Sequence, residues 1–413
     1  MNATGLDLPL SPAASGSRPH IDLLDPQPFA RNSFWNTFEW LRANEPIHRH
    51  PGPDADFWVF SRHADIVRIY ADAEHFSSRF GMRLDSDPAA VASVAQRMLI
   101  VSDAPEHTAL KRTLMQWFGP AQMPRMEALV RQVVTDLVDD DALDQPIDFI
   151  DLAKRLPNHV VCALMDLPRS DWDWIGKVTT EAFDGDQDDE RTGAHSEIFL
   201  YFSDLLAQRR AHPGDDFVSW VAHEGSVGDG RSLTDEEIIF NCNGVLSGAN
   251  ETTRYSAAGA VLAFAEDPAQ WARLRETGPA GVPAAVEETL RWTTPGVHAM
   301  RTVTSPVTIA GQELWPGERV TLWNVSANRD EAVFDEPNRF VVDRQPNRHI
   351  AFGHGRHLCL GARLARYELA TLFGRLLDRV GGVELLAPPT FTPSNFTWGV
   401  RSLSVRLTSV TTK

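Results

Sequence analysis

The chain of 413 residues carries a formal net charge of −17 and only three cysteines. That charge argues against nucleic acid and anionic membrane surfaces as partners, and three scattered cysteines argue against a disulfide framework or a zinc site. Because no apolar run approaches the roughly 18 residues of a transmembrane helix and no signal peptide is evident, we expect a cytoplasmic protein without a membrane anchor. Residues 1–20, rich in Ser, Pro, Gly and Ala, are expected to form a flexible tail.

The first hundred residues contain several short elements. Their apolar patterns predict helices at 34–43 and 62–70 and a strand at 57–60. Residues 77–101 show no clear pattern and are expected to be irregular. A stretch of this length without regular structure is often functional.

A further helix is predicted from about residue 105, because Asp103 and Pro105 are typical of a helix start. His107 and Lys111 are four residues apart and therefore share one face of this helix. Taken alone, the pair is best interpreted as part of a solvated charged face. More helices are predicted over 120–210, where the acidic segment 184–190 is expected to be a solvated loop.

The longest predicted helix begins after Thr234, which forms a capping box with Glu237. Its pattern runs to about residue 265, which gives a length of roughly 46 Å. The middle of this helix, residues 246–253, contains Gly, Asn and two Thr, which are poor helix formers. We expect a weakened backbone ladder and a local kink there.

This weak segment has two interpretations. It is either a tolerated defect or a functional face, because Val245, Gly248, Ala249 and Thr252 fall on one side of the helix. Small residues on that side leave room for a cofactor and a small gas ligand. Glu251 then places an acid beside the hydroxyl of Thr252.

The last third of the chain is predicted to mix helices and strands. Glu288 and Arg291 are three apart on a predicted helix, and in isolation such a pair contributes little. Residues 296–325 alternate in the manner of strands, and 396–398 are expected to lie in a closing hairpin. An apolar helical pattern over 362–377 follows a glycine-rich loop that contains Cys359.

Cys359 has three interpretations. It is a buried structural cysteine, a catalytic nucleophile with His357 as a neighbouring base, or a thiolate ligand of haem iron. A helix N-terminus directly after it stabilises the thiolate form. The order of residues over 352–361, Phe-x-x-Gly-x-His-x-Cys-x-Gly, resembles the haem-binding loop of the cytochrome P450 superfamily and favours the third interpretation.

The resemblance extends over about residues 20–410. It implies a mainly α fold with a minor β part (α+β), in which a helical domain and small β-sheets surround a buried haem. Length alone suggests two or three domains, but one site assembled from residues 107 to 361 implies a single domain over 21–413. It also implies haem b as the cofactor.

The resemblance assigns roles residue by residue. Cys359 is expected to bind the iron, and Glu251 and Thr252 to deliver protons. The residues expected to contact the cofactor are His107, Lys111, Arg301 and His357 at its propionates, with Phe352, Gly353, Gly361 and Ala249 around it. Arg112 is the alternative to Lys111 at the propionate. The expected substrate pocket contains Val245, Gly248, Val297, His298 and Phe396. Glu288, Arg291 and Arg344 are expected to form a structural cluster, with Arg339 as the alternative third member.

The implied function is monooxygenation of a medium or large organic molecule by O2, with a natural-product biosynthetic intermediate as substrate. Ferredoxin and an NAD(P)H-dependent ferredoxin reductase are the implied electron donors, because the chain has no flavin or iron–sulfur motif. Arg112, Arg356, Arg363 and Arg366 are expected to form a basic patch near Cys359 for an acidic ferredoxin. The chain is expected to be monomeric. The alternatives are a peroxide-driven peroxygenase, an oxidative coupling enzyme and a non-catalytic haem-binding sensor.

Overall fold

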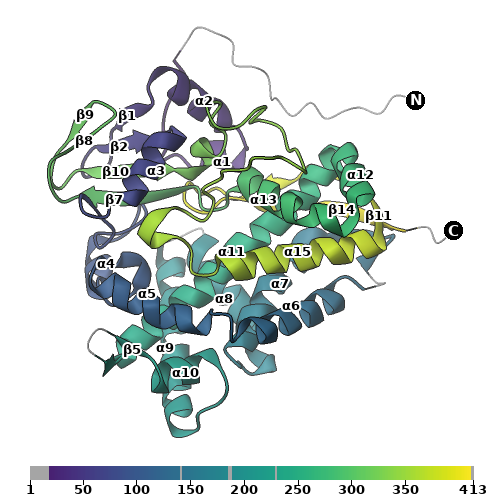
Figure 1. Cartoon of the computed structure of the whole chain (residues 1–413), viewed down its shortest axis with the longest axis horizontal. Helices are drawn as coiled ribbons and strands as arrows, with labels where there is room; N and C mark the ends of the chain where they lie inside the picture. The colour runs from purple at the N-terminus through teal and green to yellow at the C-terminus, as the bar shows by residue number, and fades with distance from the viewer. Residues whose placement is uncertain (1–17, 140–141, 185–187, 228–229, 411–413) are drawn as a thin grey trace.

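The computed structural model describes residues 18–139, 142–184, 188–227 and 230–410. Most of the predicted tail and residues 185–187 of the acidic segment lie outside these residues. The described ends of that segment belong to the helices α8 (Trp172–Asp184) and α9 (Asp188–Ala211), so the prediction of a loop over 184–190 is wrong there. Helices dominate the described chain, with one larger sheet to one side (Figure 1). The prediction of a mainly α fold with a minor β part is therefore confirmed, whereas the single-domain organisation stays a prediction.

The larger sheet has the strand order β1-β2-β10-β7-β3. Its members are β1 (Ile47–His50), β2 (Phe57–Phe60), β3 (Phe76–Ser77), β7 (His298–Val303) and β10 (Arg319–Trp323). The β10–β2 pair is parallel and the others are antiparallel. Helix α3 (His63–Ala71) buries Ile66, Ile69 and Tyr70 against this sheet. The sheet thereby joins the N-terminal segment to residues 298–323.

The helical part surrounds α11 (Asp235–Glu266), which is 32 residues long. Its other long members are α5 (Glu106–Trp117), α6 (Met123–Leu137), α7 (Phe149–Leu164), α8 (Trp172–Asp184), α9 (Asp188–Ala211), α12 (Pro268–Thr277), α13 (Val282–Thr293) and α15 (Ala362–Arg379). Helix α11 contacts α7, α8, α9, α13 and α15, so it lies at the centre of the molecule (Figure 1). Among the described residues, no helix is both long and apolar enough to cross a membrane.

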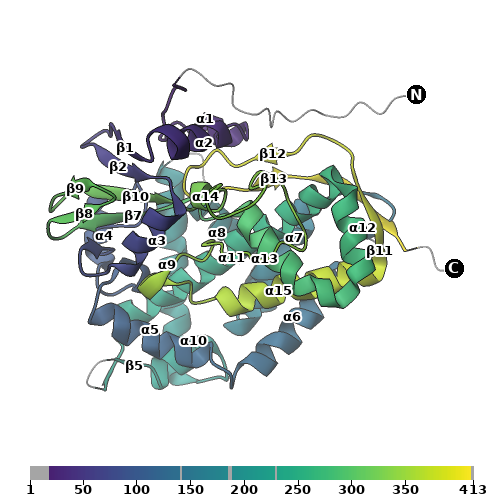
Figure 2. The ribbon, with the colours of Figure 1, turned by 45° about the horizontal axis from the view of Figure 1, so that its top comes forward.

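Shorter elements complete the fold. They are the helices α1 (Gln27–Ala30), α2 (Trp35–Asn44), α4 (Pro88–Val94), α10 (Phe217–His223) and α14 (Asn324–Ala327), and the strands β4 (Pro146–Asp148), β5 (Ser226–Val227), β6 (Arg231–Ser232), β8 (Val307–Ile309), β9 (Gln312–Leu314), β11 (Val380–Leu385), β12 (Thr390–Phe391), β13 (Val400–Ser402) and β14 (Ser404–Ser409). Figure 2 shows β12 and β13 beside the N-terminal helices. Trp398 ties this hairpin to α1 by donating a hydrogen bond of 2.9 Å to the carbonyl of Phe29.

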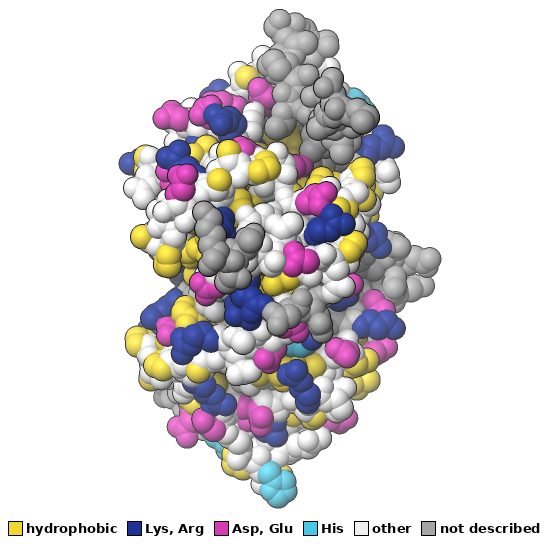
Figure 3. Space-filling view, turned by 90° about the vertical axis from the view of Figure 1, so that its right-hand side faces the viewer, with side chains coloured by type: hydrophobic (Ala, Val, Ile, Leu, Met, Phe, Trp, Pro, Cys, Tyr) yellow, Lys and Arg dark blue, Asp and Glu magenta, His cyan; other side chains and the backbone are white. Residues whose placement is uncertain are grey.

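The molecular face at the right of Figure 1 carries interspersed positive and negative side chains (Figure 3). Mixed charge of this kind suits a solvated surface better than a docking site for a strongly charged partner.

Most predicted elements are confirmed within one or two residues. The prediction for 77–101 is wrong in part, because this stretch contains β3 and α4. Helix α4 begins at Pro88, and the carboxylate of Asp87 accepts hydrogen bonds from the backbone N–H groups of Ala89 and Ala90. An Asp N-cap followed by Pro is a helix-start signal. The helix is only seven residues long and buries none of its side chains, so it shows no strong amphipathic pattern.

The long helix α11 has the predicted capping box of Thr234 and Glu237. Its weak middle segment does not interrupt the helix. Instead, the hydroxyl of Thr252 donates a hydrogen bond of 3.0 Å to the carbonyl of Gly248 one turn earlier. Thr is known to compete for helix carbonyls in this way.

Candidate haem and oxygen-activation site

The loop that carries Cys359 is folded back on itself ahead of α15. The backbone N–H of Cys359 donates a 3.0 Å hydrogen bond to the carbonyl of Phe352. Gly355 has φ of +68°, and a Cβ atom there would lie 2.4 Å from the carbonyl oxygen of Tyr70. Only glycine permits this backbone conformation and this close approach. The loop is therefore held against the end of α3.

The environment of the Cys359 thiol acts on its pKa in two directions. Desolvation by the surrounding protein raises the pKa, and this effect is the largest. The backbone N–H groups of Gly361 and Ala362 and the charges of Lys111 and Arg366 lower it. Helix N-termini and cations are the features that favour a thiolate. Cys359 is also the exposed cysteine, whereas Cys162 and Cys242 are buried.

Lys111 is positioned on the cysteine loop. Its ammonium donates hydrogen bonds of 2.5 Å and 2.9 Å to the carbonyls of Arg356 and Leu358. Two of the three donors of the ammonium are thus used by the loop and one is left, and the role of Lys111 at a propionate stays a prediction.

A cluster of basic side chains lies next to the loop. The rings of His107 and His357 have centroids 4.0 Å apart, and the His357 Nε2 atom lies 3.1 Å from the hydroxyl oxygen of Ser78. Burial and then the charge of Lys111 lower the pKa of His107 to about 4. Burial and then the charge of Arg301 lower the pKa of His357 to about 2. With these pKa values both histidines are neutral at pH 7. A neutral imidazole still has one N–H group, which can donate a hydrogen bond to a carboxylate.

These residues fit haem b. The Nδ1 atom of His107 is buried and has no hydrogen-bond partner among the described residues, and buried polar atoms normally have one. Arg301, buried beside His357 and Tyr70, adds a permanent charge. A Cβ atom added at Gly248 or at Gly361 would meet nothing within 4 Å. A thiolate, a basic cluster that suits carboxylates and open space at two glycines together match a haem with two propionates.

The helix α11 contributes two chemically different faces. Gly248 and Thr252 lie one turn apart, and Val245 and Ala249 are partly buried beside them. Glu251 is buried, with 2% of its surface exposed, and pairs with Arg254. Adjacent residues of an α-helix point about 100° apart. The carboxylate of Glu251 and the hydroxyl of Thr252 therefore diverge from neighbouring positions.

The predicted structural cluster is present in the structure. The carboxylate of Glu288 lies 2.7 Å from Arg291 and 3.0 Å from Arg344, and all three side chains are buried. Arg344 is thus the third member. Arg339 contributes only its carbonyl, which accepts from both other arginines, while its own guanidinium pairs with Glu336 at the surface.

The residues predicted for the substrate pocket separate into two groups. Val245 and Gly248 lie on α11, whereas Val297, His298 and Phe396 pack near the larger sheet. Val297 is fully buried in a cluster with Trp323 and Trp398. The ring of His298 packs on Trp323 and Phe396, and burial lowers its pKa to about 4. Val297 is thus a core residue of this cluster.

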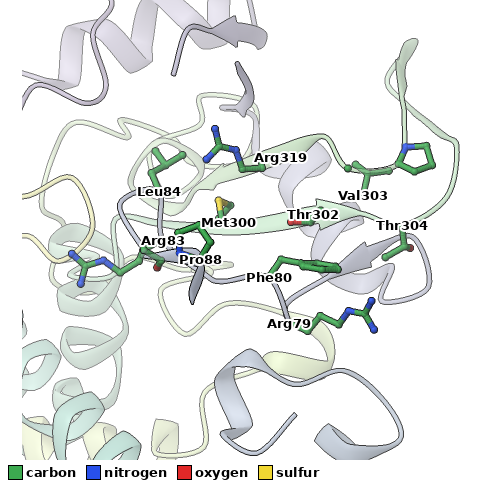
Figure 4. A pocket seen from close by; sticks show the side chains of 13 residues that line it. Arg79, Phe80, Arg83, Leu84, Pro88, Met300, Thr302, Val303, Thr304 and Arg319 are labelled. Carbon is green, nitrogen blue, oxygen red and sulfur yellow. The ribbon is translucent and has the colours of Figure 1, made fainter. Parts of the chain in front are cut away.

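A cavity of about 540 Å³ lies between residues 79–88 and the sheet (Figure 4). Phe80, Leu84 and Met300 form apolar walls, and Met300 precedes Arg301 on β7. Arg83 lines the cavity, and its guanidinium lies 4.8 Å from the ring centroid of Phe396. The stretch 77–101 thus lines a pocket, on the side of the sheet that carries Met300.

Sequence reasoning missed two contributors to the site. Ser78 contacts His357 from a position 279 residues away, which no local pattern indicates. Arg254 pairs with Glu251, and its position three residues later on the same helix is a signal that would have found it.

Comparisons with known proteins agree with this site. Residues 282–380 match the cytochrome P450 family. Cytochrome P450 NovI of Streptomyces niveus is 34% identical over 403 residues, covering 94% of this chain and 96% of that protein. Linalool 8-monooxygenase of Pseudomonas putida is 31% identical over 408 residues, covering 94% and 98%. The crystal structure of P450 OxyD, involved in the biosynthesis of vancomycin-type antibiotics, superimposes with a TM-score of 0.85 at 34% identity, covering 94% of this chain and 100% of that chain. The chain therefore belongs to the cytochrome P450 family and is a monooxygenase that uses haem b.

Proposed function

We propose that this monooxygenase receives its electrons from a ferredoxin, which an NAD(P)H-dependent reductase reduces in turn. Arg112, Arg356 and Arg363 are exposed around the Cys359 loop and α15, and no ion pair engages them within the described chain. The exposed apolar side chains of Met115 and Leu358 lie in the same segments. A basic rim with apolar contacts suits an acidic protein partner.

Arg366 does not belong to this docking surface. Its guanidinium forms two hydrogen bonds to the carboxylate of Glu287, at 2.6 Å and 2.9 Å, and lies 4.6 Å from the ring centroid of Phe352. It is therefore engaged within the protein. We assign Arg366 to the support of Phe352, the first residue of the cysteine loop.

For the substrate, we propose a medium or large organic molecule from natural-product biosynthesis. The support is the similarity to OxyD, which is involved in the biosynthesis of vancomycin-type antibiotics. A screen of candidate molecules by the change in haem spin state on binding tests this proposal. A panel in which only small hydrocarbons bind would contradict it.

When bound, the haem supplies the activation of O2 for insertion of one oxygen atom into the substrate. Cys359 holds the cofactor by its thiolate, and His107, His357 and Arg301 orient it through its carboxylates. Gly248 and Ala249 leave space on α11 for oxygen. Thr252 positions a proton on the cofactor side of the helix, and Glu251 replaces that proton from the other side.

The observation that carries this proposal is the buried Glu251 next to Thr252 on the central helix. The Thr252→Ala variant removes the hydroxyl, keeps a good helix former and leaves the carboxylate in place. Substrate binding and NADPH consumption should persist, whereas hydrogen peroxide formed per NADPH should rise at the expense of product. The measurement compares this ratio in wild type and variant with identical redox partners.

Two results would contradict the assignment. An unchanged ratio would leave Thr252 as a spacing residue, and full activity with peroxide alone would favour a peroxygenase. Thr253→Ala is the matched control, because Thr253 is a buried threonine at the next position of α11. Its substitution should leave the peroxide ratio unchanged.

A further inference from the structure

A cluster of three side chains meets next to Phe352, the first residue of the cysteine loop. Glu287 lies on α13 and Arg366 on α15, two helices that contact each other (Figure 1), and His349 lies in the segment ahead of the loop. The Glu287 carboxylate lies 2.6 Å and 2.9 Å from two nitrogen atoms of Arg366 and 3.0 Å from the Nε2 atom of His349. One carboxylate therefore holds two chain segments, and we call these three residues the Glu287 cluster.

The hydrogen bonds of His349 decide which of its ring nitrogens carries the hydrogen. The backbone N–H of Ala351 donates to the Nδ1 atom of His349 over 3.2 Å. A ring nitrogen that accepts a hydrogen bond has no hydrogen of its own, so the hydrogen is assigned to Nε2, which donates it to Glu287. The side chain of His349 is only 3% exposed, so water does not compete for these bonds. The ring thus connects the carboxylate to the backbone of the residue directly before Phe352.

Arg366 holds the side chain of Phe352. Its guanidinium lies 4.6 Å from the centroid of the Phe352 ring, and the His349 ring lies 6.2 Å from the same ring. Two hydrogen bonds to one carboxylate fix the plane of a guanidinium, so Glu287 sets where this cation rests on the ring. The carbonyl of Phe352 in turn accepts the 3.0 Å hydrogen bond from the N–H of Cys359. Glu287 is therefore linked through Phe352 to the expected iron ligand.

The two charges of the cluster have opposite effects at the cysteine. Burial raises the pKa of Glu287, but hydrogen bonds from His349 and Arg366 lower it to about 2, so the carboxylate is ionised at pH 7. Desolvation raises the pKa of Cys359 and the charge of Arg366 lowers it, so this cation acts at the sulfur. A nearby cation favours the reduced iron, because reduction adds one negative charge, and the carboxylate offsets that effect. The two side chains are 41% and 32% exposed, so solvent moderates both effects.

We propose that the Glu287 cluster sets the reduction potential of the haem, with Glu287 as the positioning residue that holds Arg366 and His349 against Phe352. The inference rests on the proposed role of Cys359 as the iron ligand. The step it controls is the transfer of one electron from the reduced ferredoxin, which is oxidised, to the iron, which is reduced; no bond forms or breaks. Arg366 favours this step and Glu287 limits it.

Glu287→Gln and Arg366→Gln test the proposal. The first variant removes the negative charge and should raise the reduction potential, and the second removes the positive charge and should lower it. The double variant should return towards the wild-type value. The measurement is a spectroelectrochemical titration of the haem-loaded protein without substrate or ferredoxin. A shift of about 18 mV, which is a twofold change in a one-electron equilibrium, is the smallest that supports the proposal.

Glu384→Gln is the matched control. Glu384 of β11 also pairs with an arginine, Arg406 of the neighbouring strand β14. Its substitution makes the same change in net charge and should leave the potential unchanged. A purely structural role of the cluster would shift both glutamine variants in the same direction, without recovery in the double variant. That result, or shifts no larger than in Glu384→Gln, would overturn the proposal.

Hydrogen–deuterium exchange of the haem-free protein tests the positioning role without the cofactor. His349→Phe keeps an aromatic ring but removes the acceptor of the Ala351 N–H, so this amide should exchange at least threefold faster than in wild type. Amides of α6 should exchange as before, and unchanged exchange at Ala351 would contradict the positioning role. If the glutamine variants do not load haem, Arg366→Lys takes their place. It keeps the charge but not the planar fork, so it should lower the potential, and a wild-type value would overturn the proposal.

The Cys359→Ser variant separates this inference from the proposal on which it rests. If its reduced carbon monoxide complex keeps the long-wavelength Soret band of thiolate ligation, the proposed iron ligand is wrong. If the band depends on Cys359 and the potentials of the cluster variants equal that of Glu384→Gln, only the role of the Glu287 cluster fails.

Discussion

The ammonium of Lys111 lies 2.9 Å from the carbonyl oxygen of Leu358, the residue directly before Cys359. With its second hydrogen bond, to the carbonyl of Arg356, it joins α5 to both sides of His357. The cysteine loop is therefore attached to α5 through Lys111, in addition to its own internal hydrogen bonds. Lys111 acts on the position of the cysteine through the backbone.

Lys111→Met should loosen this loop. The substitution keeps an unbranched side chain but removes the charged donor of two exposed carbonyls, and each lost hydrogen bond costs roughly 0.5–1.5 kcal/mol. We expect faster hydrogen–deuterium exchange of the amides over 352–361 in the haem-free protein. Haem should also transfer more rapidly from the loaded variant to an acceptor protein.

Arg112→Met provides the control for this prediction. Arg112 is the next residue on α5 and is exposed. Its substitution should change neither exchange nor haem transfer, and it should weaken ferredoxin binding instead. Equal exchange in the Lys111 and Arg112 variants would show that the anchor contributes nothing.

Cys359→Ser tests the identity of the iron ligand. The reduced carbon monoxide complex of the wild type should show the long-wavelength Soret band of thiolate ligation, and the serine variant should lose it. Cys162→Ser and Cys242→Ser serve as controls, because both thiols are buried in the core whereas Cys359 is exposed. Retention of the band in Cys359→Ser would place the ligand elsewhere.

Helices and strands were predicted correctly where the sequence carries a local signal, such as a capping box or an alternating apolar pattern. The capping box of Thr234 and Glu237 placed the start of α11, and alternation over 296–325 placed β7 to β10. The signal failed at α4, because a seven-residue helix that buries no side chain is too short to show a clear apolar period. The parallel pairing of β10 with β2 was also beyond local reasoning, since it joins residues about 260 positions apart.

The sequence indicated which residues belong to the site, but it did not indicate which atoms these residues contact. The family resemblance identified His107, Lys111 and His357, but the ammonium of Lys111 binds loop carbonyls, which depends on how α5 approaches the loop. Arg366 was expected at the surface and pairs with Glu287 on α13 instead. Long flexible cations reach several acceptors, so their partners follow from tertiary packing.

Glu288→Ala should destabilise the fold strongly. The carboxylate accepts hydrogen bonds from Arg291, from Arg344 and from the backbone N–H of Val341, at 2.7 Å for the last. Its removal leaves two buried guanidinium groups without their anion, which costs roughly 3–5 kcal/mol. We expect a lower melting temperature and little haem-loaded protein, measured by absorbance per unit of protein.

Glu336→Ala is the appropriate comparison for this cluster. Glu336 also pairs with an arginine three residues away, Arg339, but both side chains are exposed. Exposed pairs contribute roughly 0–1 kcal/mol, so this variant should load haem normally. Normal loading of Glu288→Ala would mean that the buried cluster is dispensable for folding.

Glu368 is expected to make the stability of the protein dependent on pH. This residue of α15 is 2% exposed, its Oε2 atom has no partner among the described residues, and burial raises its pKa to about 8. Between about pH 4.5 and pH 8 the folded chain keeps a proton that the unfolded chain has lost. Stability should therefore fall as pH rises through this range, by at most about 1.4 kcal/mol per pH unit from this group.

Glu368→Gln replaces the neutral acid by a neutral amide of the same shape and removes the titration. We expect the variant to lose less stability than the wild type between about pH 5 and pH 8, measured by thermal unfolding of the haem-loaded protein at both values. Glu276→Gln, at an exposed position of α12, should follow the wild type. Because every other titrating group is shared, the difference between the curves isolates Glu368, and parallel curves would show that its carboxyl is ionised in the folded protein.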